Sequence, residues 1–427
     1  MLEGTVQSNG ELPIGIDRLL GKTTGHVRSI STEVARRHPT GAVQTELVEP
    51  SLKRLLPDDY TENPSLAVSG KGMTARQGML SAIGEYCERY CLFWPPEYHD
   101  LSEFEGAAVE LDAAGHDRVP MATLAFYTAE QLTTIDRKPF DHTTPARWVA
   151  GHDLTTGEAI YVPAELLFLA PVAEELHYYP TTNGAACGST IETALLGSLY
   201  ELIERDAVMR QWFTQRSPPR LGQDPDSPLG ELRTAHASGE YRIELLDLDA
   251  AIGYAIGATL VDPNDRMPKF LLAAGADLDP IRAAEDAVIE LQQGLRTLQW
   301  SACRDRQPSI DPGEIMNFED NVEYYARPEH FEEVAVYFEG PAGTVSVDRA
   351  IPATRSEELA ELVDSFAAAD LTPIAVDLTL PDIAAAGLVV TEVFVPELVG
   401  LSLPSLPPAN HPAFDGYSLT EKPHPFP

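Results

Sequence analysis

The sequence is poor in lysine, and this shortage excludes one class of partner. Lysine occurs only six times in 427 residues, whereas aspartate and glutamate together number 66, so the formal net charge is −36. Phosphate backbones repel such a chain, which argues against nucleic acid as a partner. The acidic residues are spread along the whole chain. We therefore expect a halophilic protein whose surface carboxylates keep it soluble at high salt, rather than one acidic patch for a basic partner.

The sequence also lacks the usual cysteine and histidine motifs of metal sites. Its four cysteines (Cys87, Cys91, Cys187 and Cys303) form no C-x-x-C pair, and its 11 histidines show no H-E-x-x-H spacing. We expect buried thiols rather than a zinc site. No apolar run reaches the roughly 18 residues of a membrane span, and the first residues show no signal-peptide pattern. These absences predict a cytoplasmic protein without a membrane partner.

One acidic pattern occurs three times, each time in a stretch with helical periodicity. The three copies are Ser81, Glu85, Glu88 and Arg89; Gly197, Glu201, Glu204 and Arg205; and Asp286, Glu290 and Gln293. Counted from the first residue of each copy, positions +4 and +7 fall on the same face of a helix as that residue. A single copy is explained by a solvated face with i,i+4 ion pairs. Three copies in one register predict three helices that point acidic edges at one pocket, where carboxylates suit a divalent cation.

Small residues precede the second of these helices and offer a phosphate site. The stretch NGAACGST begins at Asn183, and a Gly-rich turn before a helix presents backbone N–H groups and a positive dipole end. Ser189 and Glu192 are also spaced as a capping box, which is a structural alternative for Glu192. The sequence VSGKG, residues 68–72, is no Walker A loop. Lys71 either reaches a phosphate as a point charge or is a turn lysine.

Helical and strand-like stretches are mixed without strict alternation, which predicts an α+β (mixed α/β) fold. Three helices carry the acidic pattern, the third from about residue 280 to 304, and a fourth covers residues 356–368. Strands are expected at residues 148–150, 159–162, 241–248, 254–261, 270–274, 372–378 and 388–395. Residues 305–350 look polar and irregular. We expect an N-terminal segment (1–60), one domain (61–405) and a proline-rich tail (406–427), of a composition typical of disordered or polyproline ends.

These motifs together resemble the YcaO family of ATP-dependent enzymes, which activate peptide-backbone amides. The resemblance covers roughly residues 65–396. It rests on SGKG followed by SAIGEYCERY, on NGAACG leading to ELIERDA, on the third helix with Glu290 and Gln293, and on the later phrases VDLTLPDI and FVPEL. It implies a YcaO-type fold with helices and mixed sheets around a non-Walker site for ATP and Mg²⁺.

The resemblance also implies roles for individual residues. Ser81, Glu85, Glu88 and Arg89 match the first ATP motif of the family, and Glu201, Glu204 and Arg205 match the second. Tyr200 departs from the polar residue that some members carry, and Arg296 and Arg304 compete for the arginine of the third motif. The candidate cofactor-binding residues are Lys71, Ser81, Glu85, Glu88, Arg89, Asn183, Glu192, Glu201, Glu204, Arg205 and Gln293. The candidate metal ligands are Glu85, Glu88, Glu201 and Glu204.

The implied activity is cyclodehydration of a ribosomally made precursor peptide, in which Cys, Ser or Thr residues become azolines. The last residues, KPHPFP, resemble the ending of azoline-forming members. This places Pro423, Pro425 and Pro427 in the active site, with His424 as a weaker candidate for a proton acceptor. Backbone thioamidation, an accessory role in ribosomal protein methylthiolation and a non-enzymatic ATP- or peptide-binding scaffold are the alternatives. We expect a separate leader-binding partner that resembles adenylating enzymes, a flavin dehydrogenase where an azole is made, and a homodimer.

Overall fold

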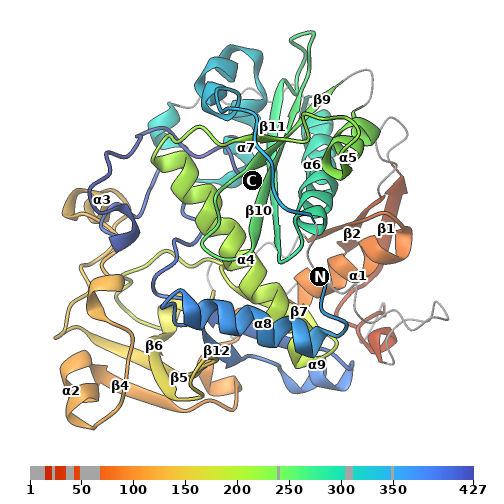
Figure 1. Cartoon of the computed structure of the whole chain (residues 1–427). Helices are drawn as coiled ribbons and strands as arrows, with labels where there is room; N and C mark the ends of the chain where they lie inside the picture. The colour runs from red at the N-terminus through yellow and green to blue at the C-terminus, as the bar shows by residue number, and fades with distance from the viewer. Residues whose placement is uncertain are drawn as a thin grey trace. The chain divides into compact units, whose positions relative to one another are not determined.

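The computed structural model describes residues 15–21, 25–34, 43–48, 68–237, 241–302, 311–347 and 351–427. The chain divides into two compact units, and Figure 1 shows its helices and strands coloured from the N-terminus to the C-terminus. The first unit comprises Met1–Glu33, Val43–Leu199 and Pro352–Glu397, and the second comprises Val34–Ala42, Tyr200–Ile351 and Leu398–Pro427. Helices and antiparallel strands are mixed in both units, so the predicted α+β class is confirmed.

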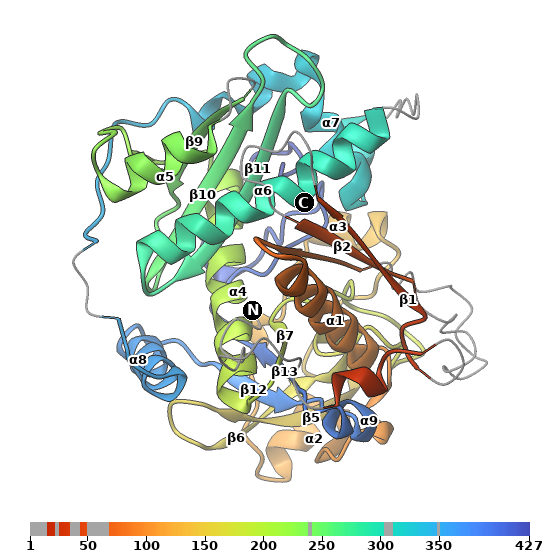
Figure 2. The same cartoon turned by 90° about the vertical axis from the view of Figure 1, so that its right-hand side faces the viewer.

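The first unit has two sheets, and helix α1 packs against both of them (Figure 2). One sheet has three strands in the order β1-β2-β3. The other has six, in the order β4-β5-β12-β13-β7, with β6 paired to β5. The strands are β1 (Ser29–Val34), β2 (Val43–Val48), β3 (Ser69–Gly72), β4 (Glu103–Ala107), β5 (Pro145–Asp153), β6 (Ala159–Pro163), β7 (Ala185–Gly188), β12 (Ile374–Asp377) and β13 (Val389–Phe394).

Helix α1 (Ala75–Leu92) begins after a capping threonine and ends before a Trp-Pro-Pro sequence. The Thr74 hydroxyl accepts a hydrogen bond from the backbone N–H of Gln77 at 3.2 Å. The other helices and 3₁₀ turns of this unit are η2 (Ile16–Arg18), η4 (Pro96–Tyr98), α2 (Ala108–Ala113), η5 (Met121–Thr123), α3 (Ala129–Thr134), η6 (Ala164–Leu166), α8 (Arg355–Ala368) and α9 (Pro381–Ala385). Helix α4 (Ile191–Phe213) begins in the first unit and continues into the second.

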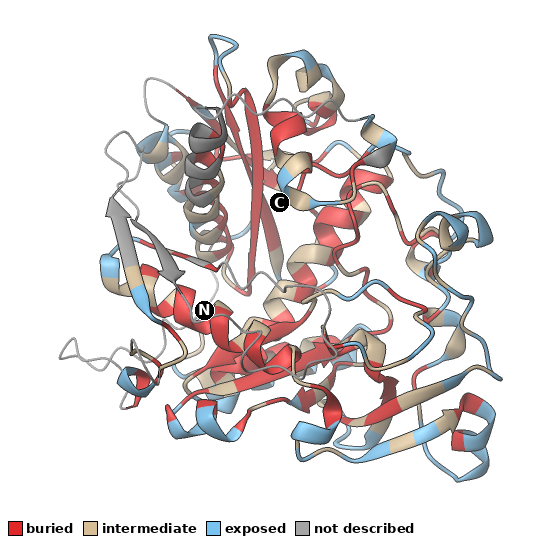
Figure 3. Ribbon diagram, turned by 180° about the vertical axis from the view of Figure 1, so that it is seen from behind, coloured by how far each residue is buried: buried red, intermediate tan, exposed pale blue. Residues whose placement is uncertain are grey.

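The second unit is built on one antiparallel sheet with the order β11-β10-β9-β8. Its elements are β8 (Arg220–Leu221), α5 (Pro228–His236), β9 (Arg242–Asp247), β10 (Tyr254–Val261), β11 (Phe270–Asp277), α6 (Pro280–Ala302), η7 (Pro312–Glu314), α7 (Phe318–Ala326), η8 (Pro328–Tyr337) and η9 (Pro412–Phe414). Helix α6 packs on β10 and β11, and every residue of β11 is buried (Figure 3). The strands and the helix predicted for this region are therefore confirmed.

Residues 305–350 are not irregular throughout, which corrects the sequence prediction. Residues 318–337 form α7 and η8, and the tyrosines that they carry complete an aromatic cluster. The rings of Tyr325 and Tyr337 each lie 5.8 Å from the ring of Trp212, and all three side chains are buried. A few apolar residues thus anchor a mostly polar stretch, which average polarity does not reveal.

Within the described residues, no helix combines the length and the apolar character that crossing a membrane requires.

Candidate active site

The partly exposed face of α1 consists of the residues of the first acidic motif. Between residues 80 and 92 every side chain is buried except Ser81, Glu85, Glu88 and Arg89. The spacing of these four residues places them on one side of the helix, as predicted. Arg89 and Glu85 form an ion pair of 2.8 Å, and each side chain is about one-third exposed. The first motif therefore forms a single polar face on an otherwise buried helix.

Strand β3 carries Lys71 directly over this face. The backbone N–H of Lys71 donates to the Ser81 hydroxyl at 3.4 Å, so the two predicted residues lie together. The glycines of SGKG permit this approach. A Cβ atom on Gly70 would lie 2.0 Å from the carbonyl oxygen of Gly78 and 2.2 Å from the backbone nitrogen of Ala82. Gly70 is thus required for packing of β3 on α1, whether or not a phosphate binds here.

Glu88 is held by a strand that lies 99 residues further along the chain. Its Oε1 accepts a hydrogen bond from the backbone N–H of Cys187 on β7, at 2.8 Å. A carboxylate that accepts a backbone N–H is fixed in orientation without the loss of its charge. Sequence spacing identifies Glu88 but gives no sign of this partner.

In the NGAACG stretch only Asn183 and Gly184 form a turn, and the other four residues are a buried strand rather than the open Gly-rich turn that the sequence suggests. Residues 185–188 form β7, in which every residue is buried. Gly184 has a φ of 87°, which favours glycine, and a Cβ atom on Gly188 would lie 2.5 Å from the backbone nitrogen of Ala194. The Asn183 Nδ2 donates to the Thr181 hydroxyl at 2.8 Å. Backbone conformation therefore explains Gly184 and packing explains Gly188, and one of the expected phosphate-binding N–H groups, that of Cys187, donates to Glu88 instead.

The cap of α4 also differs from the expected capping box. The hydroxyl of Thr190, not that of Ser189, accepts the backbone N–H of Thr193, at 3.3 Å. Glu192 lies in the first turn, and hydrogen bonds from its own backbone N–H and from the Thr190 hydroxyl lower the pKa of its carboxyl. Glu192 thus interacts with the N-terminus of α4, but not through the Ser189 capping box that the sequence suggests.

The second acidic motif repeats the geometry of the first. Residues 201–209 of α4 are buried except Glu201, Glu204 and Arg205. The ion pair between Arg205 and Glu201 measures 2.5 Å, and both side chains are mostly buried. The next residue, Asp206, is fully buried. Burial raises the pKa of its carboxyl, although Oδ1 accepts the backbone N–H of Val399 at 2.9 Å. Asp206 therefore connects α4 to the backbone at Val399 within the second unit, although it is not part of the predicted motif.

The third motif lies on α6. Asp286 and Glu290 are partly exposed there, one helical turn apart. The side chains of Gln293 and Arg296, and the whole of Arg304, lie outside the described residues. No group of three or more His, Cys, Asp or Glu side chains that could hold a metal ion occurs in the described part of the chain. Mg²⁺ that arrives with ATP needs fewer protein ligands, because phosphates and water complete its shell.

The C-terminal residues are packed and not disordered. The side chains of Pro423, His424, Pro425 and Phe426 are buried, and Pro427 is partly exposed. The Tyr325 hydroxyl donates to the Pro423 carbonyl oxygen at 2.6 Å, and the Trp212 Nε1 donates to the Lys422 carbonyl oxygen at 3.2 Å. Aromatic residues of α4 and α7 thus bind the end of the chain through its backbone, within the second unit.

His424 does not suit the role of a proton acceptor for a substrate. Its side chain is fully buried, its Nε2 lies 2.9 Å from the carbonyl oxygen of Ser402, and burial lowers its pKa to about 4. An imidazole that is shielded from solvent, with one nitrogen on a backbone carbonyl, cannot meet a peptide from outside. The candidate role given to His424 is therefore wrong, and its side chain has a structural function.

Comparison with known proteins identifies the family. A family model described as YcaO cyclodehydratase, ATP- and Mg²⁺-binding, matches residues 69–399. The chain belongs to the YcaO family. ATP and Mg²⁺ are the cofactors in the description of this family, as the sequence predicts.

Two curated relatives of this YcaO protein are uncharacterized. One, from Methanothermobacter thermautotrophicus, is 30% identical over 54% of this chain and 57% of its own length. The other, described as an uncharacterized protein in the tfuA 3′ region of Rhizobium leguminosarum bv. trifolii, is 26% identical over 55% of this chain and 64% of its own length. The matches thus span less than two thirds of these relatives.

Three solved structures share the fold of this YcaO protein. A heterocyclase in complex with substrate and cofactor has a TM-score of 0.73 at 21% identity, over 96% of this chain and 56% of that chain. YcaO from Methanopyrus kandleri bound with AMPPCP and Mg²⁺ has a TM-score of 0.63 at 23% identity, over 93% and 90%. The E. coli microcin synthetase McbBCD complex with pro-MccB17 bound has a TM-score of 0.65 at 14% identity, over 95% and 98%. These likenesses confirm the predicted YcaO-type fold.

Proposed function

We propose that this protein is an ATP-dependent cyclodehydratase that acts on a ribosomally made precursor peptide. The observation that carries the proposal is the polar face of α1, where Ser81, Glu85, Glu88 and Arg89 are the only side chains between residues 80 and 92 that are not buried. Solvation alone would explain one such face, but the second motif on α4 repeats the pattern, which favours a ligand site. Membership of a family described as a cyclodehydratase supports the same reading.

The residues fit a nucleotide that carries magnesium. Glu85 and Glu88 on α1, and Glu201 and Glu204 on α4, are proposed as metal ligands. Glu88 has its orientation already fixed by the Cys187 N–H. Arg89 and Arg205 each form an ion pair with a glutamate one turn earlier, which keeps that glutamate in a fixed rotamer and limits repulsion between the carboxylates. Lys71, Ser81 and Asn183 are proposed to contact the nucleotide as well.

Gln293 and Glu192 complete the proposed nucleotide-binding set. Glu192 contributes through the first turn of α4, where its carboxylate already interacts with the helix N-terminus. Gln293 lies on α6 in the register of the third motif, but its side chain lies outside the described residues. Gln293 is proposed from the register of the third motif and Glu192 from the resemblance to the family, and neither is proposed from a contact.

The reaction needs an oxygen of the peptide to leave. A Cys, Ser or Thr side chain of the substrate attacks the preceding carbonyl carbon and loses its proton, so that a five-membered ring forms. Bound Mg·ATP supplies the phosphoryl group that lets the former carbonyl oxygen depart as phosphate. Loss of the amide proton then closes the C=N bond, and the products are an azoline, ADP and phosphate. The task of the protein is to hold the reactants in place and to neutralise charge.

Calorimetric titration with Mg·ATP tests the nucleotide site. Glu88→Gln and Glu204→Gln each remove one charge without a change in size, and we expect each to weaken ATP binding by about tenfold or more, about 1.4 kcal/mol. Glu130→Gln and Glu231→Gln change exposed carboxylates on α3 and α5 and serve as matched controls. Unchanged affinity in both motif variants would remove these residues from the site.

Pro423, Pro425 and Pro427 are proposed as part of the active site, where the buried Pro423 and Pro425 fix the course of the chain end and the partly exposed Pro427 positions the activated amide. The proline-rich end is already ordered by contacts from Tyr325 and Trp212. Proline also loses little conformational entropy on docking. Deletion of residues 423–427 is expected to leave ATP binding intact and to abolish ring formation when precursor and partner are present. Full ring formation by the truncated protein would contradict this role.

The product distinguishes the proposed reaction from its rivals. Cyclodehydration removes one water per ring from the precursor, whereas thioamidation exchanges a backbone oxygen for sulfur. An accessory role in methylthiolation of a ribosomal protein, or a binding scaffold, leaves the peptide unchanged. Mass spectrometry of the precursor after incubation with the protein and ATP therefore separates cyclodehydration from thioamidation, and both of these from the two roles that leave the peptide unchanged.

A separate partner protein is proposed to bring the precursor to this chain. The McbBCD neighbour is described as a complex with pro-MccB17 bound, which supports a multi-protein arrangement in that system. We extend this arrangement to the present protein, with a leader-binding partner that resembles adenylating enzymes. A flavin dehydrogenase that oxidises the ring and a homodimeric state are further proposals. Co-purification with candidate partners, with and without the precursor, tests them.

A further inference from the structure

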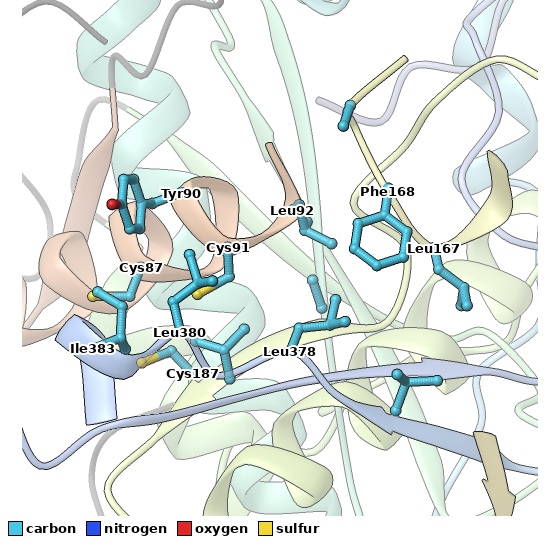
Figure 4. Packing of buried hydrophobic residues seen from close by; sticks show 14 of the residues in the cluster. Cys87, Tyr90, Cys91, Leu92, Leu167, Phe168, Cys187, Leu378, Leu380 and Ile383 are labelled. Carbon is cyan, nitrogen blue, oxygen red and sulfur yellow. The ribbon is translucent and has the colours of Figure 1, made fainter. Parts of the chain in front are cut away.

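Three buried thiols meet in the core of the first unit. Cys87 and Cys91 lie on α1 and Cys187 lies on β7, and Figure 4 shows their sulfur atoms on facing elements. All three are free thiols. A hydrogen bond to the Cys187 thiol and burial raise the pKa of Cys87, so its thiol stays protonated. Protonated thiols that are shielded from solvent react poorly, and these groups act through their packing.

The Cys87–Cys187 contact lies next to Glu88 on both elements. Cys87 directly precedes Glu88 on α1, and the backbone N–H of Cys187 donates to Glu88 Oε1 at 2.8 Å. One residue of β7 therefore contacts α1 twice, by its thiol and by its amide. The separation of α1 and β7 at this point decides whether the amide can reach the carboxylate.

The strand pairing explains why this N–H points at the helix. Cys187 is paired with Val390 on β13. The N–H of Val390 donates to the Thr379 hydroxyl, and its carbonyl oxygen accepts the N–H of Leu378, so both groups point away from β7. Cys187 and Val390 are hence a non-hydrogen-bonded pair of the antiparallel ladder. The N–H of Cys187 then points out of the sheet edge, toward α1.

We propose that Cys187 is a positioning residue for Glu88, and this inference rests on the proposed function of Glu88 as a magnesium ligand. The amide of Cys187 fixes Oε1 of Glu88, and its thiol, packed on Cys87, sets the distance over which that hydrogen bond acts. A small side chain at position 187 is then a requirement of the Mg·ATP site and not only of the core. A metal ligand that has lost its orienting partner binds less tightly.

A volume change at position 187 tests the inference. Cys187→Val adds a branched side chain against Cys87, and we expect the Mg²⁺ concentration for half-maximal ATP binding to rise about tenfold. Cys187→Ser keeps the small size and should stay within about twofold of the parent. Cys91→Val overpacks the same core one turn further along α1, where the thiol meets the Leu380 backbone instead. It should lower the melting temperature without a change in the Mg²⁺ requirement.

A compensating variant keeps the test valid if Cys187→Val folds poorly. Cys87→Ala in the same chain makes room for the valine, and the double variant should recover both folding and the parental Mg²⁺ requirement. An equal Mg²⁺ requirement in Cys187→Val and Cys91→Val would overturn the inference, as would a double variant that folds but is not rescued.

Glu88→Gln in the same assay separates the role of Glu88 from the role of Cys187. If Glu88→Gln weakens Mg·ATP binding and Cys187→Val does not, Glu88 keeps its role and only the positioning role of Cys187 fails. If Glu88→Gln binds Mg·ATP like the parent, the proposed role of Glu88 fails, and the role of Cys187 fails with it.

Discussion

The side-chain amide of Asn321 donates a 2.5 Å hydrogen bond to the carbonyl oxygen of His424, 103 residues away. The same Nδ2 also lies 3.2 Å from the carbonyl oxygen of Phe426, so one buried side chain of α7 holds two peptide groups of the C-terminal segment. The carbonyl groups of buried backbone need such donors. The order of the C-terminal segment therefore depends on a residue that is remote in sequence.

Asn321→Asp is expected to release this segment. The substitution keeps the shape but replaces the donor by a carboxylate oxygen that faces carbonyl oxygens, at a cost of roughly 1–3 kcal/mol. If the terminal prolines position the activated amide, ring formation should fall while Mg·ATP binding persists. Glu329→Gln, an exposed change on η8, is the matched control. Ring formation at the parental rate in a folded Asn321→Asp variant would show that docking of the segment is not required.

His424 predicts a pH dependence of stability. Burial lowers its pKa from 6.5 to about 4, so between these pH values the unfolded chain binds a proton that the folded chain does not. Stability should therefore fall as the pH drops from 6.5 to 4, by roughly 3 kcal/mol from this group alone. His424→Gln removes the titration, and the loss of unfolding free energy over that range should be smaller by this amount. Identical pH profiles in urea unfolding would contradict the prediction.

The residues on the acidic faces could be predicted from the sequence because helical spacing is a local property. Periodicity alone placed Ser81, Glu85 and Glu88 on one side of α1, and the structure leaves that side partly exposed. The partner of Glu88 could not be predicted, because the Cys187 N–H reaches it through a fold contact between residues 99 positions apart. Spacing identifies which side chains share a face, and tertiary packing decides what each one meets.

Glycine-rich stretches were harder to interpret from the sequence. Gly188 looks like part of a phosphate-binding turn and Gly70 like part of a turn beside Lys71, yet each permits a close backbone contact. Gly70 contacts α1, and Gly188 contacts the start of α4. The absence of a Cβ atom permits either a close backbone contact or the approach of a phosphate, and amino-acid composition does not distinguish these two roles. The proline-rich end posed the same problem. Its composition also fits a disordered tail, and the contacts from Asn321 and Tyr325 that order it come from distant residues.

The Gly70→Ala variant distinguishes a packing role of Gly70 on β3 from a role in phosphate binding. The new Cβ would meet backbone atoms of α1 at 2.0 and 2.2 Å, which cannot move without the helix. We expect a loss of roughly 2–3 kcal/mol or more in the free energy of unfolding. Gly313→Ala is the control, because the nearest atom to its Cβ would be an Asp311 carboxylate oxygen at 3.6 Å. A Gly70→Ala variant with parental stability but weaker ATP binding would instead favour a role of this segment, with Lys71, at the phosphates.

The charge of the chain predicts halophilic behaviour. The chain has a formal charge of −36, and its acidic residues are spread along the sequence. These carboxylates lie closer together in the folded state than in the extended chain, so they repel one another more strongly there. At about 1 M salt the Debye length is only about 3 Å, so repulsion between surface carboxylates is screened, whereas short ion pairs such as Arg205–Glu201 persist. The melting temperature should therefore be higher in concentrated KCl than in dilute buffer. Concentrated KCl precipitates proteins only weakly. A matched series of melting temperatures in tetramethylammonium chloride, which screens charge without K⁺, would show whether screening or a specific effect of K⁺ raises the melting temperature. A melting temperature that is equal or lower in concentrated KCl would refute the halophilic assignment and leave the acidic surface to be explained by a basic partner.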